Sequence, residues 1–536
     1  MAFPKGSSCS VCVDVMPNSV NQSEMASLSQ GSGLHAGNVA NFLLDGKEAA
    51  RTALLLLDRS YTYGELQSSA AAVAHYLLSQ GGRKGDRVVL ASENSFFWVS
   101  AYLGTLLAGM VSVPIAPNVA PDELEHIARL TEPRFAFLQS KVALASGARL
   151  GAAAVITEAA RGASRLATSF DDVARHALDP NAEVPRVGSG DLAAIIFTSG
   201  STGEPRGVKI SHGNIIANTE SIIQYLKLGQ TDRVMAVLPL YYCFGASLLH
   251  THLRVGGSVV LDLRFMYPDT VLKRMVETDC TGFAGVPSHY QILLRRSSLS
   301  RISFPALRYV QQAGGHLAAV FVRELQAALP GKQIFLMYGQ TEATARLSYL
   351  PPELVSLKAG SIGKAIPGVH LRVVTAEHAD ARPGEIGEIV AEGDNISLGY
   401  WRDPAETETT FRDGKLHTGD LATVDEDGFL YLVDRAKDFV KCGGERVSCQ
   451  VIEEQLLEFG ALLEAAVIGV PDEVLGESIK LFVVPRESGT PDLENRLRQF
   501  CKKHLPPRLN PKLIVVLSSL PKNSAGKVLK AALRKL

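Results

Sequence analysis

Stretches with helical periodicity alternate with short apolar runs along the first part of the chain. The pattern predicts a helix over about Tyr61–Gln80, ended by the pair Gly81-Gly82. A strand is predicted at Asp86–Leu90, and further short apolar runs follow at Phe135–Leu138 and Ala154–Ile156. This alternation indicates a layered α/β architecture with largely parallel sheets.

The stretch Asn94–Pro121 carries no charged residue and has the apolar character of a membrane span. Gly109 and Pro114 interrupt it, however. We therefore predict a buried helix over Phe96–Ala108 and a following strand over Met110–Pro114, as in a sheet that is covered on both faces.

Further strands are predicted downstream at Val234–Leu238 and Gln333–Met337. Beyond the turn residues Gly360–Gly368, the apolar runs Leu371–Thr375 and Glu388–Ala391 alternate with glycine-rich turns. This second pattern predicts a small sheet or barrel.

Beyond Val451 the pattern becomes that of a compact α+β unit of the size of a small domain. Its helices are predicted at Val451–Leu457 and Leu493–His504, and its strands at Ala465–Gly469 and Ile479–Val484. The predicted fold class is therefore α/β. A large N-terminal domain of layered α/β sheets carries a small β-barrel-like subdomain and is followed by a small α+β C-terminal domain.

Composition narrows the function classes. The 536 residues favour about two to four domains, and 46% hydrophobic residues supply an ample core. The 54 Lys and Arg balance 55 Asp and Glu, so nothing indicates a nucleic-acid partner or an anionic membrane. The C-x-x-C formed by Cys9 and Cys12 has no second pair, which disfavours zinc or redox chemistry and leaves a reduced, cytoplasmic compartment as the expectation. The first 36 residues lack the apolar core of a signal peptide and are predicted to form a loosely ordered tail.

One stretch rich in glycine and hydroxyl residues follows a predicted strand directly. The strand is Asp191–Phe197, and the stretch is Thr198–Gly207. Glycines allow consecutive N–H groups to point into one concavity where an anion binds, and hydroxyls add donors for phosphate oxygens. Arg206 and Lys209 bring positive charge. The Walker spacing is not met, so this is either an ordinary surface loop or a phosphate loop of another kind.

Two further clusters follow predicted strands. Pro239–Gly245 combines aromatic residues with a glycine, which suits either the wall of a small-molecule pocket or plain core packing. Tyr338–Glu342 places hydroxyl and small residues at a strand end, followed by a carboxylate that suits a nucleotide and its magnesium. An acidic residue in the first turn of a helix is the alternative. His250 and His252 have no further ligand nearby and are predicted to be packing or polar-face residues.

Polar residues near the end of the chain allow several functions. The carboxylate of Asp420 could accept hydrogen bonds from both hydroxyls of a ribose, and Arg435 supplies a fork of donors close by. The alternatives are a turn carboxylate and a surface ion pair of little energetic value. Lys527 follows Gly526 on a predicted exposed turn, where most lysines are simply solvated.

These stretches, in this order, resemble the adenylate-forming superfamily of acyl-CoA synthetases, luciferases and peptide-synthetase adenylation domains. The resemblance runs from about Asn38 to the C-terminus. Each motif alone is weak evidence for the family, but the five motifs in this order and spacing are specific to it. The alternative interpretations of the individual motifs given above are therefore disfavoured. The motifs are the phosphate loop, Tyr338–Glu342, His417–Asp420, Asp434-Arg435 and Ser524–Lys527.

The resemblance implies a two-step ligation. A carboxylate attacks the α-phosphorus of ATP to give an acyl-adenylate and pyrophosphate, and a thiol then displaces AMP. The implied cofactors are ATP, Mg²⁺ and coenzyme A or phosphopantetheine, and the implied partners are the acid, ATP and CoA. The attacking carboxylate is already ionised near neutrality, so the first step needs no general base. Its difficulty is the approach of two anions, which positive charge and fixed donors relieve.

The resemblance also implies roles for individual residues. Lys527 would contact the substrate carboxylate and the α-phosphate, and Asp420 and Arg435 the ribose. The catalytic set is Lys527, Thr341, Glu342 and Tyr242, and the metal ligands are Thr198 and Glu342. The implied ATP-binding and AMP-binding residues are Thr198, Ser199, Gly200, Ser201, Thr202, Gly203, Gly314, Gly315, Tyr338, Gly339, Gln340, Thr341, Asp420, Arg435 and Lys527. The implied acyl pocket is lined by Tyr241, Tyr242, Phe244, Gly245 and Gly314.

For the second step, the resemblance implies that a mobile C-terminal domain rotates about a hinge at Lys437. Lys527 would leave the cleft, and Lys441, Gly443 and Gly444 would come in beside the pantetheine channel. The implied division is a flexible tail at 1–36, an adenylation domain at 37–436 and a mobile domain at 437–536.

The chain departs from the family pattern at two positions. Tyr242 stands where acyl-CoA synthetases often carry histidine, so the gate before the thiol tunnel differs. Cys243 falls near the aspartate of amino-acid-activating relatives, which disfavours an α-amino acid because an unpaired buried ammonium is costly. The short segment Ala345–Ala359 leaves no room for the insertion found in relatives that stop at the fatty acyl-adenylate.

We therefore expect a fatty, aryl or other non-amino acid as substrate and the thiol of CoA as the final acceptor. A separate carrier protein with its phosphopantetheine is the close alternative. A P-loop-type NTPase is a distant alternative, and a catalytically silent relative is disfavoured because Lys527, Glu342, Asp420 and Arg435 are all present.

Overall fold

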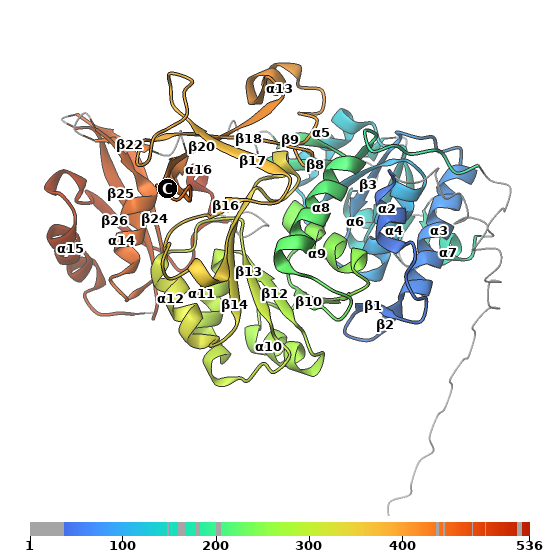
Figure 1. Cartoon of the computed structure of the whole chain (residues 1–536), viewed down its shortest axis with the longest axis horizontal. Coiled ribbons are helices and arrows are strands. Elements are labelled where there is room, and N and C mark those ends of the chain that lie inside the picture. The colour runs from blue at the N-terminus through green and yellow to red at the C-terminus, as the bar shows by residue number, and fades with distance from the viewer. Residues whose placement is uncertain are drawn as a thin grey trace, which may run out of the picture.

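The computed structural model describes residues 37–146, 150–151, 153–158, 167–176, 183–199, 205–435, 439–442, 445–473, 475–487, 489–522 and 528–536. These residues form four sheets with flanking helices (Figure 1). The layered α/β fold class expected from the sequence is confirmed.

A seven-stranded sheet has the order β7-β6-β5-β3-β4-β8-β9 and is parallel except for the antiparallel β8–β9 pair. Helices on both sides bury both of its faces, which explains its continuous apolar strands. One of these layers consists of α5 (Pro121–Thr131) and α6 (Ser140–Ser146). The strands are β3 (Arg87–Ala91), β4 (Val111–Ile115), β5 (Phe135–Leu138), β6 (Ala154–Thr157), β7 (Thr168–Ser169), β8 (Leu192–Ser199) and β9 (Pro205–Ser211).

A nine-stranded sheet has the order β16-β15-β14-β13-β12-β10-β11-β1-β2. The run from β14 to β1 is parallel, and the strands at both edges are antiparallel. The strands are β1 (Thr52–Leu55), β2 (Ser60–Thr62), β10 (Arg233–Ala236), β11 (Ser258–Leu261), β12 (Gly282–Gly285), β13 (Tyr309–Gln312), β14 (Gln333–Tyr338), β15 (Ser348–Leu350) and β16 (Lys364–Ala365). Its outer face carries α10 (Pro268–Glu277), α11 (Pro287–Arg296) and α12 (Ala319–Ala328).

The largest core lies between these two sheets. It is continuous from the strands of one sheet to those of the other through a helical layer, in which Trp98 of α4 is fully buried. The layer contains α2 (Val39–Leu44), α3 (Tyr63–Ser79), α4 (Phe96–Leu107), α8 (His212–Leu226) and α9 (Cys243–Arg254), and α7 (Phe170–Ala174) packs against α3.

The uncharged stretch at residues 94–121 is accounted for by α4 and β4, as predicted. Ser95 caps α4 by accepting a hydrogen bond from the Trp98 N–H, and the helix is buried along most of its length. In the described part of the chain, no helix combines the length and the apolar character that a bilayer crossing requires.

The small sheet predicted after Gly368 is a five-stranded antiparallel sheet. Strands β17, β18 and β20 follow one another, and both β19 and β21 pair with β20. Its elements are β17 (Val369–Val374), β18 (Gly387–Gly393), α13 (Pro404–Thr410), β19 (Phe411–Arg412), β20 (Lys415–Val424) and β21 (Leu430–Arg435).

The C-terminal part is an α+β unit built on a separate five-stranded sheet, with apolar clusters on both faces. In Figure 1 it lies at one end of the molecule beside α11 and α12, and the seven-stranded sheet lies at the other end. Its elements are β22 (Phe439–Cys442), β23 (Glu445–Ser448), α14 (Cys449–Leu457), β24 (Leu462–Asp472), β25 (Gly476–Pro485), α15 (Leu493–His504), β26 (Leu513–Val516) and α16 (Lys530–Leu533).

Two predicted boundaries were wrong for physical reasons. The helix predicted from Tyr61 begins at Tyr63, because Thr62 and Glu65 form a capping box and the preceding residues pair with β1 as β2. The predicted loop Thr198–Gly207 is shorter than expected, because β9 starts at Pro205 and pairs with β8 in a hairpin.

Candidate active site

The carboxyl ends of two neighbouring parallel strands carry the first part of the candidate site. Gly314 and Gly315 follow β13, and Tyr338 ends β14. The two strands run in parallel register, so their ends meet at the edge of the sheet where open α/β folds bind ligands. Gly314 has a φ of +82°, a conformation that glycine adopts without strain.

Asp420 reaches the same place from β20 of the five-stranded sheet. The Tyr338 hydroxyl donates a hydrogen bond to Asp420 Oδ2 over 2.7 Å, and the two residues are only 8% and 7% exposed. In the register of β20 and β21, Asp420 stands opposite Arg435. The structure therefore brings together residues that the sequence had assigned separately to one nucleotide site.

The turn after β14 is set by Gly339. A Cβ at this position would lie 2.1 Å from the carbonyl oxygen of Ala345, so only glycine permits this approach. The chain then continues through Gln340 into a 3-10 helix at Thr341–Ala343. Both Gly339 and Gln340 are half-buried, so they remain partly accessible at the strand end.

The carboxylate of Glu342 is held by Tyr400, which lies between β18 and α13. The Tyr400 hydroxyl donates to Glu342 Oε1 over 2.9 Å. Burial raises the pKa of Tyr400, and the negative charge of Glu342 raises this pKa further, so the phenol stays protonated as a donor. One carboxylate oxygen is thus fixed while the residue remains half-buried.

Thr344 closes this turn in a strained conformation. Its φ of +65° is unusual for a β-branched residue. Its hydroxyl donates to the carbonyl oxygen of Asn395 over 2.7 Å, which holds the strained backbone in place. Strain of this kind concentrates at functional sites.

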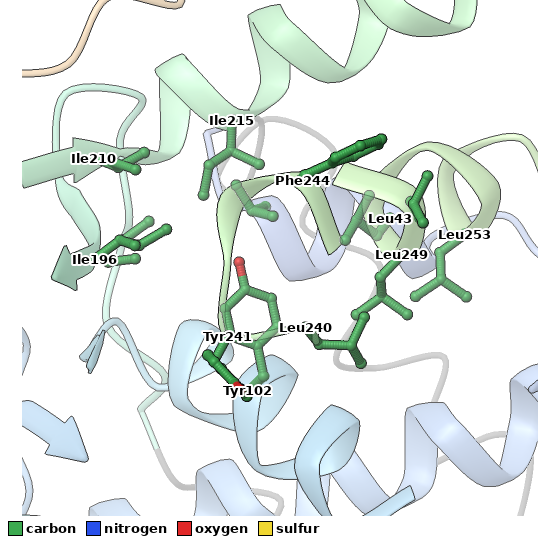
Figure 2. Close-up of a cluster of buried hydrophobic side chains, with 14 of the residues drawn as sticks. Leu43, Tyr102, Ile196, Ile210, Ile215, Leu240, Tyr241, Phe244, Leu249 and Leu253 are labelled. Carbon is green, nitrogen blue, oxygen red and sulfur yellow. The ribbon is translucent and has the colours of Figure 1, made fainter. Parts of the chain in front are cut away.

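The aromatic segment before α9 packs against this turn. The rings of Tyr241 and Tyr242 lie 4.8 Å apart between centroids, and Cys243 Sγ is 3.6 Å from Thr341 Oγ1. Figure 2 shows Tyr241 and Phe244 among buried aliphatic side chains of β8, β9 and α8, including Ile196, Ile210 and Ile215.

The aromatic segment is divided between core positions and partly accessible ones. Tyr241 and Phe244 are core residues, whereas Tyr242 and Cys243 remain partly accessible. Gly245 has a structural reason to be glycine, because a Cβ there would lie 2.0 Å from the carbonyl oxygen of Pro239.

A cavity of about 340 Å³ opens at the strand ends, between the large domain and the C-terminal part. Gly314, Gly315, Tyr338, Gly339 and Asp420 line it from the large domain. Lys522 and Val528, which form an isolated antiparallel bridge, line it from the other side together with Glu453, Glu464 and Lys530.

Polar contacts connect the two sides of this cavity. The Arg323 guanidinium pairs with Glu458 over 2.8 Å, and His316 Nε2 lies against Glu454 Oε1. Burial alone would raise the pKa of Glu454, but the interactions with His316 and Gln450 hold this pKa below its usual value.

Several predicted site residues lie outside the described part of the chain. These are Gly200, Ser201, Thr202, Gly203, Lys437, Gly443, Gly444 and Lys527, and the side chains of Ser199 and Arg435. Thr198 lies near the end of β8, opposite Arg206 of β9. Lys441 is exposed on β22, and its backbone N–H donates to Glu477 Oε2 over 2.6 Å.

The guanidinium of Arg206 pairs with two acidic residues. Its Nη1 pairs with Glu406 over 2.6 Å, and its Nε lies 3.6 Å from Asp403. The guanidinium is thus neutralised by α13 and the residue that caps it. The sequence could not reveal this pairing, because the acidic residues lie about two hundred positions away.

The two histidines of α9 pack as predicted. His250 Nε2 is hydrogen-bonded to the Tyr102 hydroxyl over 2.9 Å, and His252 Nε2 to the Tyr309 hydroxyl over 3.0 Å. Burial lowers the pKa of His250 to about 3 and that of His252 to about 4. In the described residues, no group of three or more His, Cys, Asp or Glu side chains is arranged to hold a metal ion.

Sequence reasoning missed two residues that shape this site. Tyr400 holds Glu342, and the buried Arg346 packs over the ring of Phe244. The only feature of the sequence that could have pointed to Arg346 is its closeness to the Tyr338–Glu342 motif. This closeness does not show whether the arginine is buried or on the surface.

Comparison with known proteins decides the family. A family model described as AMP-binding enzyme matches residues 45–401, and one described as AMP-binding enzyme C-terminal domain matches residues 451–527. The chain belongs to the AMP-binding enzymes, the adenylate-forming superfamily. The resemblance stated from the motifs is confirmed.

Named relatives of this AMP-binding enzyme are acid–CoA ligases. It is 31% identical over 518 residues to a long-chain-fatty-acid–CoA ligase of Salmonella typhimurium, covering 91% of this chain and 92% of the relative. It is 33% identical over 488 residues to a feruloyl-CoA synthase of an Amycolatopsis species, covering 88% and 93%. The crystal structure of the anthranilate CoA ligase AuaEII with anthranoyl-AMP matches with a TM-score of 0.85 at 26% identity, covering 94% of this chain and 97% of that one.

The protein is therefore an AMP-forming acid–CoA ligase, and a carboxylic acid, ATP and CoA are its substrates. This assignment excludes the alternative of a P-loop-type NTPase.

Proposed function

We propose that this enzyme activates a non-amino carboxylic acid, of the fatty or aryl class, to an acyl-adenylate and then transfers the acyl group to the thiol of CoA. The observation that carries the proposal is the convergence of Gly314, Tyr338 and Asp420 on one cavity, with Thr341 and Glu342 on the adjoining turn. Each residue type suits a different part of ATP.

The nucleotide would be held from its ribose to its phosphates. Asp420, oriented by Tyr338, would accept from the ribose hydroxyls together with donors from Arg435. The glycine pair Gly314-Gly315 leaves the cavity wall open for the adenine, and Gly339 and Gln340 would lie beside the nucleotide. Thr341 would contact the α-phosphate, and the loop Thr198–Gly203 would hold the leaving pyrophosphate.

Glu342 suits a magnesium ion that is bound mainly by phosphates. Mg²⁺ is usually held by one or two carboxylates plus substrate oxygens, rather than by a cage of protein ligands. The hydrogen bond from Tyr400 fixes one oxygen of Glu342, and Thr198 would add a hydroxyl. The bound ion would neutralise part of the charge that develops on the pyrophosphate.

Lys522 and Val528, the described residues on either side of the Lys527 segment, both line the same cavity. They also bridge to one another, so the chain between them starts and ends at this site. This placement supports contact of Lys527 with the substrate carboxylate and the α-phosphate, where a cation lowers the repulsion between the two anions.

The acid would bind beside Cys243 and Tyr242, which are partly accessible next to Thr341. The neighbouring Arg346 is positively charged and therefore disfavours a substrate ammonium at this position. We infer that the acid is not an α-amino acid.

For the second step, the C-terminal domain would rotate about Lys437 and exchange Lys527 for the segment Lys441–Gly444. The contact between Arg323 and Glu458 is solvent-exposed, and such pairs contribute about 0–1 kcal/mol. This contact therefore opposes the rotation only weakly. Free CoA is the proposed acceptor, as in the named relatives.

The test is acid-dependent exchange of labelled pyrophosphate into ATP over a panel of fatty, aryl and amino acids. Exchange with a fatty or aryl acid but with no amino acid is the expected result. Exchange confined to amino acids would contradict the proposal. The acceptor is decided separately, by comparing thioester formation on free CoA with that on isolated carrier protein. Faster reaction with carrier protein would overturn the CoA assignment.

A further inference from the structure

Arg346 is a buried cation without a counter-ion. It is 1% exposed and belongs to the largest fully buried side chains of the protein. Its Nε donates to Met337 Sδ over 3.4 Å and its Nη1 to the Ala345 carbonyl oxygen over 3.4 Å, and both contacts are long. Its Nη2 has no hydrogen-bond partner, and no carboxylate in the described chain pairs with the guanidinium. The Tyr225 hydroxyl also interacts with this group, but burial raises the pKa of Tyr225, so the phenol is neutral and supplies no counter-charge.

This arrangement is unfavourable unless something completes it. Guanidinium groups remain charged in proteins and are almost never fully buried unless paired. Burial lowers the pKa of Arg346, which expresses the same penalty. Arg295, whose side chain is 7% exposed, shows the contrast, because its two terminal nitrogens face both carboxylate oxygens of Glu324 while the group packs over Phe321.

The position of Arg346 is tightly fixed. The side-chain amides of Asn218 and Asn395 both donate to its backbone carbonyl oxygen, over 3.1 and 2.9 Å. Its guanidinium lies 4.0 Å from the centre of the Phe244 ring. These contacts fix the backbone of Arg346 and pack its guanidinium against the ring, so the charge needs little reorganisation to act at this place.

The charge lies next to the place where the acid would bind. Cys243 precedes Phe244, over whose ring the Arg346 guanidinium packs, and Cys243 Sγ is 3.6 Å from Thr341 Oγ1. Cys243 is surrounded by protein atoms and yet remains partly accessible. Arg346 therefore lies close to Cys243 and Thr341, beside which the acid is proposed to bind.

We propose that Arg346 is the specificity-determining residue for a substrate that carries a second carboxylate. One carboxylate is activated beside Thr341, and the other is received by the guanidinium of Arg346, which finds in it the missing counter-ion. A bidentate Arg–carboxylate pair is among the strongest hydrogen-bonded interactions and suits this planar donor. This inference rests on the proposed function and narrows its acid class to dicarboxylic acids.

The experiment measures kcat/KM for pyrophosphate exchange with matched acids of the same length. The pairs are butyrate with succinate, hexanoate with adipate, and benzoate with terephthalate. For at least one pair, the wild-type enzyme is expected to prefer the diacid by about tenfold or more. Arg346→Met should reverse this preference, and Arg346→Lys should keep part of it because it retains the charge.

Arg295→Met is the matched control, since it also removes a buried arginine from over a phenylalanine ring, but away from the site. It should change thermal stability without changing the preference. ATP binding, measured by calorimetry, verifies that the Arg346 variants are folded.

Two results would overturn the inference and leave the proposed function standing. One is a wild-type preference for the monoacid in every pair, and the other is an unchanged preference in folded Arg346→Met. Absence of exchange with every acid would instead reject the proposed function, and the inference with it.

Discussion

The hydroxyl of Tyr338 donates a hydrogen bond to the carboxylate of Asp420 over 2.7 Å, although the two residues are 82 positions apart in the chain. Tyr338 ends a strand of the nine-stranded sheet, and Asp420 lies in the five-stranded sheet. The bond therefore ties the two sheets together at the wall of the cavity. Because both residues are buried, the direction of the carboxylate depends on this bond.

Replacement of Tyr338 by Phe tests the role of this bond. The ring remains, but Asp420 loses a donor, and hydrogen bonds to charged groups contribute about 1.5–3 kcal/mol. We expect kcat/KM for ATP to fall roughly tenfold to a hundredfold, with a much smaller change in the KM for the acid. Steady-state kinetics of adenylation measure both.

Tyr431→Phe is the control, since it removes a tyrosine hydroxyl that donates to Asp425 over 3.2 Å, in a turn outside the cavity. Its kinetics should match those of the wild type. A Tyr338→Phe enzyme with an unchanged kcat/KM for ATP would rule out the ribose assignment of Asp420.

Replacement of Tyr400 by Phe tests the magnesium role of Glu342. The carboxylate would lose the phenol that fixes one of its oxygens. Loss of such a supporting bond typically costs about tenfold or more in metal affinity. The Mg²⁺ concentration for half-maximal adenylation should therefore rise about tenfold, while the maximal rate at saturating Mg²⁺ is largely recovered.

Tyr76→Phe provides the comparison, because it removes a hydrogen bond of similar length, to Thr168, on the far side of α3. It should leave the Mg²⁺ titration unchanged. If the Tyr400→Phe titration also coincided with that of the wild type, Tyr400 would not support a metal ligand at Glu342.

Much of this fold was predictable from local patterns, because an element's period and end signals lie within its own residues. Helix α15 and strand β5 have the predicted bounds, and α4 and β4 explain the uncharged stretch without a membrane span. The strand before the glycine-rich stretch was correctly predicted, but the return strand β9 was missed because Pro205 was taken for loop.

The contacts of the site were not predictable in the same way. The pairing of Arg206 with Glu406 and the burial of Arg346 depend on which distant segments the fold brings together. Spacing along the chain carries no information about such contacts. The motifs therefore indicated which segments form the candidate site. The charged partners of the residues around the site could be identified only from the structure.

The buried histidines predict how stability depends on pH. The pKa of His250 is about 3 in the folded protein, below the reference value of 6.5. Above pH 6.5 the residue is neutral in both states and its contribution to stability is fully present. As the pH falls below 6.5, the unfolded chain binds a proton that the folded protein does not. The free energy of unfolding then decreases by up to about 1.4 kcal/mol per pH unit.

Between pH 6.5 and pH 5, the free energy of unfolding should decrease less steeply in the variant His250→Gln than in the wild type, because glutamine does not titrate. The difference between the two slopes should be at most about 1.4 kcal/mol per pH unit. Urea unfolding at both pH values measures the difference. His370→Gln, at an exposed position of β17, should leave the pH dependence close to that of the wild type. Equal slopes in the His250 variant and the wild type would show that His250 is not buried in its neutral form.

Replacement of Lys527 by Ala separates the two half-reactions. We assign to its positive charge the role of reducing the repulsion between the substrate carboxylate and the α-phosphate in the first step. The attack of a thiol on a supplied acyl-adenylate does not involve this repulsion. We expect pyrophosphate exchange to be abolished, while thioester formation from a supplied acyl-adenylate and CoA is largely retained. Lys535→Ala removes a lysine from an exposed position of the same C-terminal segment and should leave both half-reactions intact. Equal loss of both half-reactions in Lys527→Ala would mean that the segment between Lys522 and Val528 serves the fold of the cavity wall, because a group needed only for adenylation cannot slow the later transfer.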